Sequence, residues 1–187
     1  MIMNEERIAR ERLEKLFALS LKHGAHADFE RGVCAMEAVA WLAGEPHSDS
    51  PKCACPVVAA LVRSWNDSLP TDEDRNRLLR PLVPKIVGTR GKTDALLLRR
   101  MWAVVDWQIR VYAPAFLRAA KLDEAARALE SLPEIDSAER LVASEKETSA
   151  AESAAESVAE SALQPTVSSL QSSMVALIER LCDMKDD

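Results

Sequence analysis

The sequence predicts an all-α fold: a compact multi-helix bundle followed by an acidic, low-complexity segment and a final amphipathic helix. Two observations favour this class. Glycine is scarce, at 5 of 187 residues, whereas alanine, leucine, glutamate and arginine, which favour helix, are frequent. In addition, no stretch alternates apolar and polar residues as a half-buried strand does. A chain of this length can form an ordinary domain with a hydrophobic core.

The charge is distributed unevenly along the chain. Residues 1–122 carry 19 Lys/Arg and 15 Asp/Glu, a net of +4, and residues 123–187 carry 5 and 15, a net of -10, which gives the whole-chain charge of -6. The basic residues are too sparse to predict nucleic-acid binding. No apolar run of about 18 residues is present and the N-terminal sequence is charged, so we expect a cytoplasmic protein without a membrane span. Its four cysteines are then expected as reduced thiols or metal ligands.

Apolar periodicity and capping residues predict the helices of the first half of the chain. The expected helices are residues 4–22, Val33–Ala43, Pro56–Asp67 and a short helix that follows Thr71. The first is expected to start at Asn4 as N-cap. It should bury four side chains: Leu13, Leu16, Phe17 and Leu21. The second ends at Gly44 and is apolar nearly all round, which indicates a central place in the bundle.

A long helix is expected from Thr93 to about Tyr112, and shorter helices follow it. Five apolar residues recur in it at spacings of four and three, which predicts a core-facing stripe: Leu98, Trp102, Val105, Ile109 and Tyr112. Pro114 opens a short helix, and Pro133 ends another. The predicted domains are a helical domain over residues 1–135, a Ser/Ala/Glu-rich segment over 136–165 that is either a linker or a solvated helix, and a C-terminal helix over 166–187.

Three of the four cysteines and one histidine gather between residues 34 and 55, which suggests a zinc site. The candidate ligands are Cys34, His47, Cys53 and Cys55, since thiolates and imidazole are the ligands that tetrahedral zinc prefers. The spacing departs from common zinc motifs, because a single residue separates Cys53 from Cys55. The alternative is that Cys34 is a small core residue and the others are reduced loop thiols.

A second candidate site consists of Glu37, Asp106 and Arg110. Glu37 is the only charged residue of its expected helix, and a buried carboxylate must be paired, protonated or bound to a metal. Asp106 can pair with Arg110 one helical turn later. Paired carboxylates can act as a general acid and base, so these residues are catalytic candidates. The alternative is an internal ion-pair network.

A third candidate is an anion site at Arg90 and Lys92. These two basic residues flank a glycine-containing turn directly before the expected long helix, and a helix N-terminus attracts anions. A turn that simply needs glycine between two helices explains the same residues.

The run GVCAMEAVAWLAGEPHSDSPKCACPV resembles a family of small bacterial and bacteriophage proteins to which no activity is assigned. The later pieces SWND, IVGTRG, VDWQIRVYAP and LPEI resemble the same family, over about residues 20–135. The resemblance implies that this region is one domain, and it implies no reaction.

These observations lead to three functional hypotheses. The first is a non-enzymatic bacterial or phage accessory protein that binds a small ligand or a protein partner, with a zinc ion, where one is bound, in a structural role. The second is a metal-dependent, hydrolase-like enzyme with Glu37 as general base. The third is a self-associating scaffold, assembled as a homo-oligomer through the apolar face of Val167–Met184.

Overall fold

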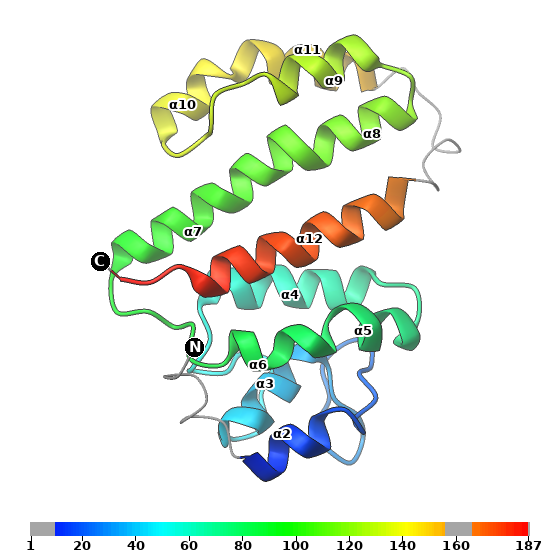
Figure 1. The fold of residues 1–187 in the computed structure, drawn as a ribbon, viewed down its shortest axis with the longest axis vertical. Coiled ribbons are helices and arrows are strands. Elements are labelled where there is room, and N and C mark those ends of the chain that lie inside the picture. Colours follow the sequence, from blue (N-terminus) through cyan, green and yellow to red (C-terminus); the bar gives the residue numbers. More distant parts are fainter. Residues whose placement is uncertain (1–9, 156–165, 187) are drawn as a thin grey trace. The chain divides into compact units, whose positions relative to one another are not determined.

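A computed structural model describes residues 10–155 and 166–186 of the chain (Figure 1). Over these residues the structure is helical, and its only extended pairing is an isolated parallel bridge between Leu21 and Val33. The prediction of an all-α, multi-helix fold is therefore confirmed. In the part of the chain that the structure describes, no helix combines the length and apolar character that crossing a membrane requires.

The chain divides into two compact units. Unit 1 comprises Met1–Leu97 and Ile178–Asp187, and unit 2 comprises Leu98–Leu177. This division differs from the predicted domains, in which residues 1–135 formed one body. Helices α7 (Asp94–Trp107) and α12 (Thr166–Asp183) each contribute residues to both units.

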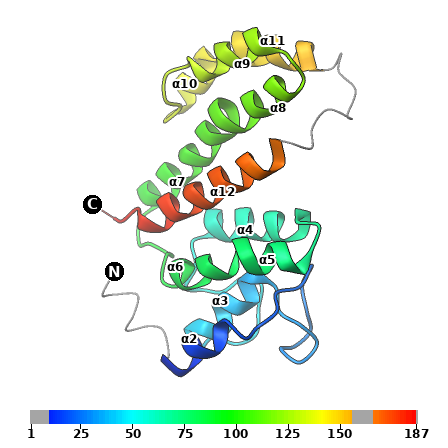
Figure 2. The same ribbon diagram turned by 45° about the vertical axis from the view of Figure 1, so that its right-hand side comes forward.

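Helix α3 (Ala35–Ala43) is the centre of unit 1, as the sequence predicted. Helices α2 (Arg10–Leu16), α4 (Pro56–Ser68) and α6 (Val83–Ile86) all pack against it (Figure 2). Seven of its nine residues are buried, because it is surrounded on most sides. It starts two residues later than predicted, since Cys34 is its N-cap, and it ends at Gly44, which adopts the left-handed conformation with φ of 76°.

Helix α2 is shorter than predicted, because it ends at Leu16 rather than near residue 22. Arg80 donates to the carbonyls of Phe17 and Leu19, at 2.9 and 3.0 Å, and so satisfies carbonyl groups where the helix stops. Phe17 was predicted to be buried but is 59% exposed. Leu21 is fully buried as predicted, but from extended backbone that pairs with Val33. The predicted N-cap Asn4 lies outside the described residues.

The remaining helices of unit 1 follow the capping and proline signals. Helix α4 begins at Pro56, and helix α5 (Asp72–Leu78) is capped by Thr71, whose hydroxyl accepts the N–H of Asp74 at 3.1 Å. A 3₁₀ turn, η1 (Arg80–Leu82), precedes α6, because two prolines interrupt regular helix in this stretch.

Unit 2 contains most of α7, followed without a break by the π-helical turn η2 (Gln108–Tyr112) and by α8 (Ala113–Ala119). Its other helices are α9 (Asp123–Glu130), α10 (Ala138–Ala143), α11 (Glu145–Ala155) and the first part of α12. Helix α9 packs between α8 and α11 (Figures 1 and 2). A hydrophobic core cluster of unit 2 contains Leu117, Ala126, Leu129 and Ala151.

The predicted stripe of the long helix is wrong as a core-facing surface. Leu98 is 50% exposed and Tyr112 is 41% exposed, whereas the buried face of α7 contains Leu96, Ala103 and Trp107. Leu98, Trp102 and Val105 lie within the regular part of α7 and do share a face, but it is not the buried one. The turn η2 affects only the residues after Trp107. Pro114 has no N–H to bond the carbonyl four residues earlier, and the helix accommodates this by a turn of i→i+5 hydrogen bonds, which winds more slowly than an α-helix.

The Ser/Ala/Glu-rich segment is helical where the structure describes it. Helices α10 and α11 cover much of residues 138–155, which decides between the linker and the helix there, and residues 156–165 lie outside the described residues. Helix α12 lies where the C-terminal helix was expected. Its apolar residues Leu170, Leu177, Ile178 and Leu181 are buried within the single chain.

Candidate functional site

The carboxylate of Glu37 is the centre of a buried, hydrogen-bonded group of polar side chains in unit 1. Glu37 lies in the first turn of α3 and is 1% exposed. Cys34, the N-cap, accepts the N–H of Glu37 with its sulfur at 3.4 Å, and the Glu37 carboxylate accepts the N–H of Cys34 at 2.7 Å. This is a capping box: the side chain of each of the two residues accepts the backbone N–H of the other.

Two histidines complete the surroundings of this carboxylate. His26 donates its backbone N–H at 2.6 Å to one oxygen and its Nδ1–H at 2.8 Å to the other. His47 places Nε2 at 3.4 Å from the first oxygen and donates to the backbone carbonyl of His26 at 3.0 Å. Four groups therefore surround the two oxygens, and a carboxylate offers about four acceptor positions. We call His26, Cys34, Glu37 and His47 the Glu37 cluster.

These donors decide the charge of Glu37. Burial by itself raises the pKa of the carboxyl, but the N–H groups of Cys34 and His26 and the ring of His26 act in the opposite direction and hold the pKa below its ordinary value of 4.5. Glu37 is therefore a carboxylate at neutral pH, and it is a weaker base than a solvated glutamate.

The backbone around His26 positions its ring. The preceding segment is held by the bridge between Leu21 and Val33, and by Asn66, which donates to the carbonyl of Lys22 at 3.0 Å. Gly32 has φ of 142° and lies so close to the ring that a Cβ there would be 2.5 Å from Cδ2 and 2.7 Å from Nε2 of His26. The backbone of Gly32 therefore lies close to the ring edge that carries Nε2.

The sequence prediction singled out three members of this cluster for other purposes and missed one. Glu37 was proposed as a catalytic residue, and Cys34 and His47 were proposed as metal ligands. His26 was missed, because it lies in a non-helical segment whose spacing to Glu37 follows no helical period. The only available signal was the requirement that a buried carboxylate has a partner.

The four predicted zinc ligands are not arranged as a metal site. Among the described residues, no three His, Cys, Asp or Glu side chains are grouped so that they could hold a metal ion. All four cysteines of the chain are free thiols. Burial raises the pKa of Cys34 to about 12 and that of Cys53 to about 11, so both are thiols at neutral pH when no metal is bound. Zinc binding remains a prediction that elemental analysis of the purified protein can test.

The loop that follows α3 is instead ordered by backbone contacts. Glu45 accepts the N–H of Lys52 at 2.6 Å and that of Cys53 at 2.8 Å. The N–H of Cys55 donates to the hydroxyl of Thr89 at 3.0 Å. These bonds explain the order of a cysteine-containing loop without a metal.

Asp106 and Arg110, the other predicted catalytic residues, form the expected ion pair in unit 2. Their closest atoms are 3.3 Å apart, and Asp106 also accepts the N–H of Ile135 at 2.9 Å. Asp106 thus fixes the segment after α9 onto the long helix. The described partners of Glu37 all belong to unit 1, and these partners of Asp106 belong to unit 2.

The predicted anion site holds an anion that belongs to the chain itself. The backbone N–H groups of Lys92 and Thr93 bind the carboxylate of Asp186. The side chains of Arg90 and Lys92, which carried the prediction, are exposed.

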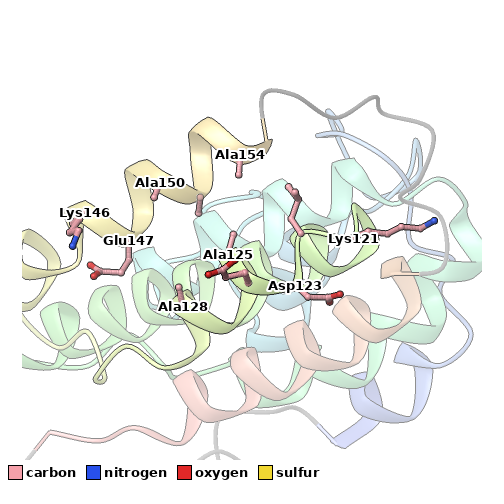
Figure 3. A pocket seen from close by; sticks show the side chains of 11 residues that line it. Lys121, Asp123, Ala125, Ala128, Lys146, Glu147, Ala150 and Ala154 are labelled. Carbon is pink, nitrogen blue, oxygen red and sulfur yellow. The ribbon is translucent and has the colours of Figure 1, made fainter.

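Unit 2 has a surface groove of about 530 Å³ between α9 and α11 (Figure 3). Alanines line its middle, and charged side chains stand at its ends: Lys146 and Glu147 at one, Lys121 and Asp123 at the other. Small side chains on two facing helices leave this space unfilled. The groove lacks the few convergent polar groups that usually fix a small ligand.

Comparisons with protein-family models, with curated proteins and with solved structures gave no match. The resemblance to small bacterial and phage proteins therefore stays a prediction, and function has to be argued from the geometry alone.

Proposed function

We propose that the chain is a non-enzymatic binding protein whose unit 2 contacts an amphipathic helix of a protein partner. The observation that carries this proposal is an apolar patch on α7, formed by Leu98, Met101, Trp102 and Val105. Leu98 is 50% and Met101 is 37% exposed, and Trp102 and Val105 are half-buried. We call these four residues the α7 patch.

The spacing of the α7 patch supports a helical partner. Its members follow one another at i, i+3, i+4 and i+7, which places them along one face of a straight α-helix. This is the pattern by which one helix packs against another in a core, and here it faces solvent. An apolar helix face of this kind is a common recognition surface for an amphipathic helix.

The Glu37 cluster supports the non-enzymatic half of the proposal. The hydrolase hypothesis needs Glu37 as a general base, but its two oxygens accept hydrogen bonds from surrounding donors and its pKa is lowered. A base in that state must break hydrogen bonds before it can take a proton. We infer that Glu37 stabilises unit 1 by joining three segments of the chain.

The burial of α12 argues against the scaffold hypothesis as it was stated. Leu177, Ile178 and Leu181 are each at most 4% exposed in a single chain, so a second copy does not find this face free. We therefore expect a monomer at neutral pH.

A site-specific photocrosslinker tests the proposal. p-Benzoylphenylalanine replaces Met101 in the full chain, which is expressed in cells of the source organism and irradiated. We expect one adduct of defined mass, identified by mass spectrometry, and its loss when Leu98→Glu is added. The matched control carries the crosslinker at Glu152, an exposed residue of α11.

Three results would contradict the proposal: no adduct at Met101, the same adduct from position 152, or an adduct that Leu98→Glu leaves unchanged. A dimer at pH 7.5 in sedimentation equilibrium that Leu98→Glu dissociates would also overturn it, because the patch would then serve self-association.

A further inference from the structure

The chain segment after α9 lies along one edge of the α7 patch. Asp106 follows Val105 directly and Trp102 by one helical turn, so it lies at the edge of the patch. Its carboxylate accepts the N–H of Ile135 at 2.9 Å, which holds residues 134–136 beside this part of α7. All of these residues belong to unit 2.

This segment presents a carboxylate at the edge of the patch. Ile135 is 1% exposed, so its side chain is buried, whereas that of the next residue, Asp136, is exposed. Arg140 lies 3.9 Å from Asp136, and the two side chains are 51% and 65% exposed. An ion pair that is so long and so exposed neutralises little of the negative charge of Asp136.

The carboxylate of Asp136 is part of an acidic stretch of the chain. Residues 134–152 contain 6 Asp/Glu and 2 Lys/Arg, a net charge of -4. They include all of α10 and most of α11, and all of them belong to unit 2. A surface with an excess of one charge attracts partners of the opposite charge and increases their rate of association.

The arginines of α7 and η2 offset this negative charge only in part. Arg110 pairs with Asp106 at 3.3 Å, so these two charges compensate each other. Arg99 is exposed two helical turns before Asp106 and has interactions of its own within the chain. It opposes a basic partner at the Leu98 end of the patch. The basic residues of a partner are therefore expected at the opposite end, near Asp136.

We infer that the partner of the α7 patch is a basic amphipathic helix, with an apolar stripe on one face and flanking lysine or arginine side chains that approach Asp136. This inference rests on the proposed function, because it specifies the chemistry of the partner for the same surface. An acidic helix would bring carboxylates towards Asp136 and the acidic stretch, and like charges across an interface oppose association.

Two synthetic peptides test the inference on the full chain. Both have about 18 residues, a length at which an amphipathic helix forms readily, and the same leucine stripe. The polar positions are lysine in one peptide and glutamate in the other. Amide NMR at pH 7.5 follows the resonances of the α7 patch during each titration. We expect the lysine peptide to bind there at least about ten-fold more tightly at low salt, and we expect added salt to reduce the difference.

Variants of Asp136 test the position of the favourable charge. Asp136→Lys should weaken binding of the lysine peptide about three- to five-fold, and Asp136→Asn should have a smaller effect of the same sign. The matched control is Glu152→Lys, which makes the same change of charge at an exposed residue of α11. We expect the control to leave the affinity nearly unchanged.

The outcomes separate a failure of this inference from a failure of the proposed function. If both peptides bind at the α7 patch with equal affinity, or the glutamate peptide binds more tightly, the inference is wrong and the proposed function stands. Equal losses of affinity in Asp136→Lys and Glu152→Lys would also overturn the inference. If neither peptide shifts the resonances of the α7 patch, the proposed function fails, and the inference fails with it.

Discussion

A side chain as buried as that of Glu37 usually loses its charge, since burial disfavours the ionised form. Here the charge is retained because backbone N–H groups and two imidazoles face the oxygens. The backbone N–H groups of His26 and Cys34 and the ring N–H of His26 would lose their acceptor if the carboxylate were removed, and an unsatisfied buried donor is costly. His47 would still donate to the carbonyl of His26.

Replacement of Glu37 by glutamine should therefore lower the free energy of unfolding by about 2–4 kcal/mol. The amide group of glutamine brings N–H donors to a place that already contains donors, so at least one of the present hydrogen bonds is lost. Urea unfolding at pH 7 measures the effect. Glu30→Gln is the control, because Glu30 is exposed, and it should change stability by less than about 0.5 kcal/mol.

The same pair of proteins should show a defined pH dependence. Because the folded state lowers the pKa of Glu37, the unfolded state binds the proton more tightly, and stability rises with pH. The advantage of the wild type over Glu37→Gln should be complete above about pH 4.5 and should shrink as the pH falls below it towards the lowered pKa of the folded state. An advantage that is the same at pH 3 and pH 7 would contradict the assigned charge.

Gly32 offers a second test at the residue scale, since its missing side chain leaves room for the ring of His26. Gly32→Ala should destabilise unit 1 and displace the ring, because a Cβ would be 2.5 Å from it. Gly24→Ala is the matched control, since Gly24 also has a positive φ, of 78°, but no atom lies within 4 Å of its added Cβ. We expect Gly32→Ala to cost about 1–3 kcal/mol more than the control in urea unfolding. Equal losses of stability would show that position 32 requires glycine because of backbone strain alone and not because of contact with His26.

For single residues, the sequence indicated that Glu37 is a buried carboxylate that needs a partner, but it did not identify His26 as that partner. A lone glutamate in an apolar helix indicates that a partner must exist, and an internal ion-pair network was one of the alternatives. Its identity depends on a segment with extended backbone and a close glycine contact, neither of which leaves a periodic pattern. The zinc hypothesis arose from the same clustering of polar residues.

Helices α9 and α11 leave a groove between them that side chains do not fill. Ala128 lines this groove and is exposed. Ala128→Leu should raise stability by up to about 1 kcal/mol, because a leucine side chain there removes apolar surface from water in a space that is already present. Thermal unfolding measures the change.

Ala143→Leu serves as the control for that substitution. Ala143 is exposed on α10 and does not line the groove, so its replacement reports the effect of leucine on a helix surface. Stabilisation of both variants by the same amount would mean that the groove does not accept the new side chain.

Helix positions were more predictable than helix faces. Gly44, Pro56 and Thr71 mark real ends of helices, because capping is a local property. The stripe from Leu98 to Tyr112 was wrong: its first residues lie on a face of regular α7 that is not the buried one, and the π-helical turn before Pro114 changes the winding only of its last residues. Phe17 was assigned to a helix that ends one residue earlier.

For the molecule as a whole, net charge and the α7 patch have opposite effects on self-association: the charge opposes it and the apolar patch favours it. The charge of -6 at pH 7 keeps copies apart, and near the isoelectric point of about 5.2 this repulsion disappears. We expect reversible association at pH 5.2 but not at pH 7.5, measured by light scattering. Leu98→Glu should reduce it, and Ala143→Glu, which adds the same charge on α10, should reduce it less. Equal effects of both would assign the association to charge alone.

The two units were not predictable from composition. The sequence changes character near residue 136, and the domain boundary was placed there. The structure places its boundaries at Leu97 and Leu177, inside α7 and α12, where no glycine, proline or polar run marks them. A boundary within a helix leaves no local signal, because both sides satisfy the same helical pattern.

The Glu37 cluster also has a consequence for the order in which unit 1 folds. Its hydrogen bonds join residues only 3, 11 and 21 positions apart. Closing short loops costs less chain entropy than closing long ones, and contacts near in sequence form faster. The ion pair of Lys85 with Glu179, by contrast, joins residues 94 positions apart. We therefore expect unit 1 to assemble around α3 first and to accept the end of α12, with Asp186, as its last element.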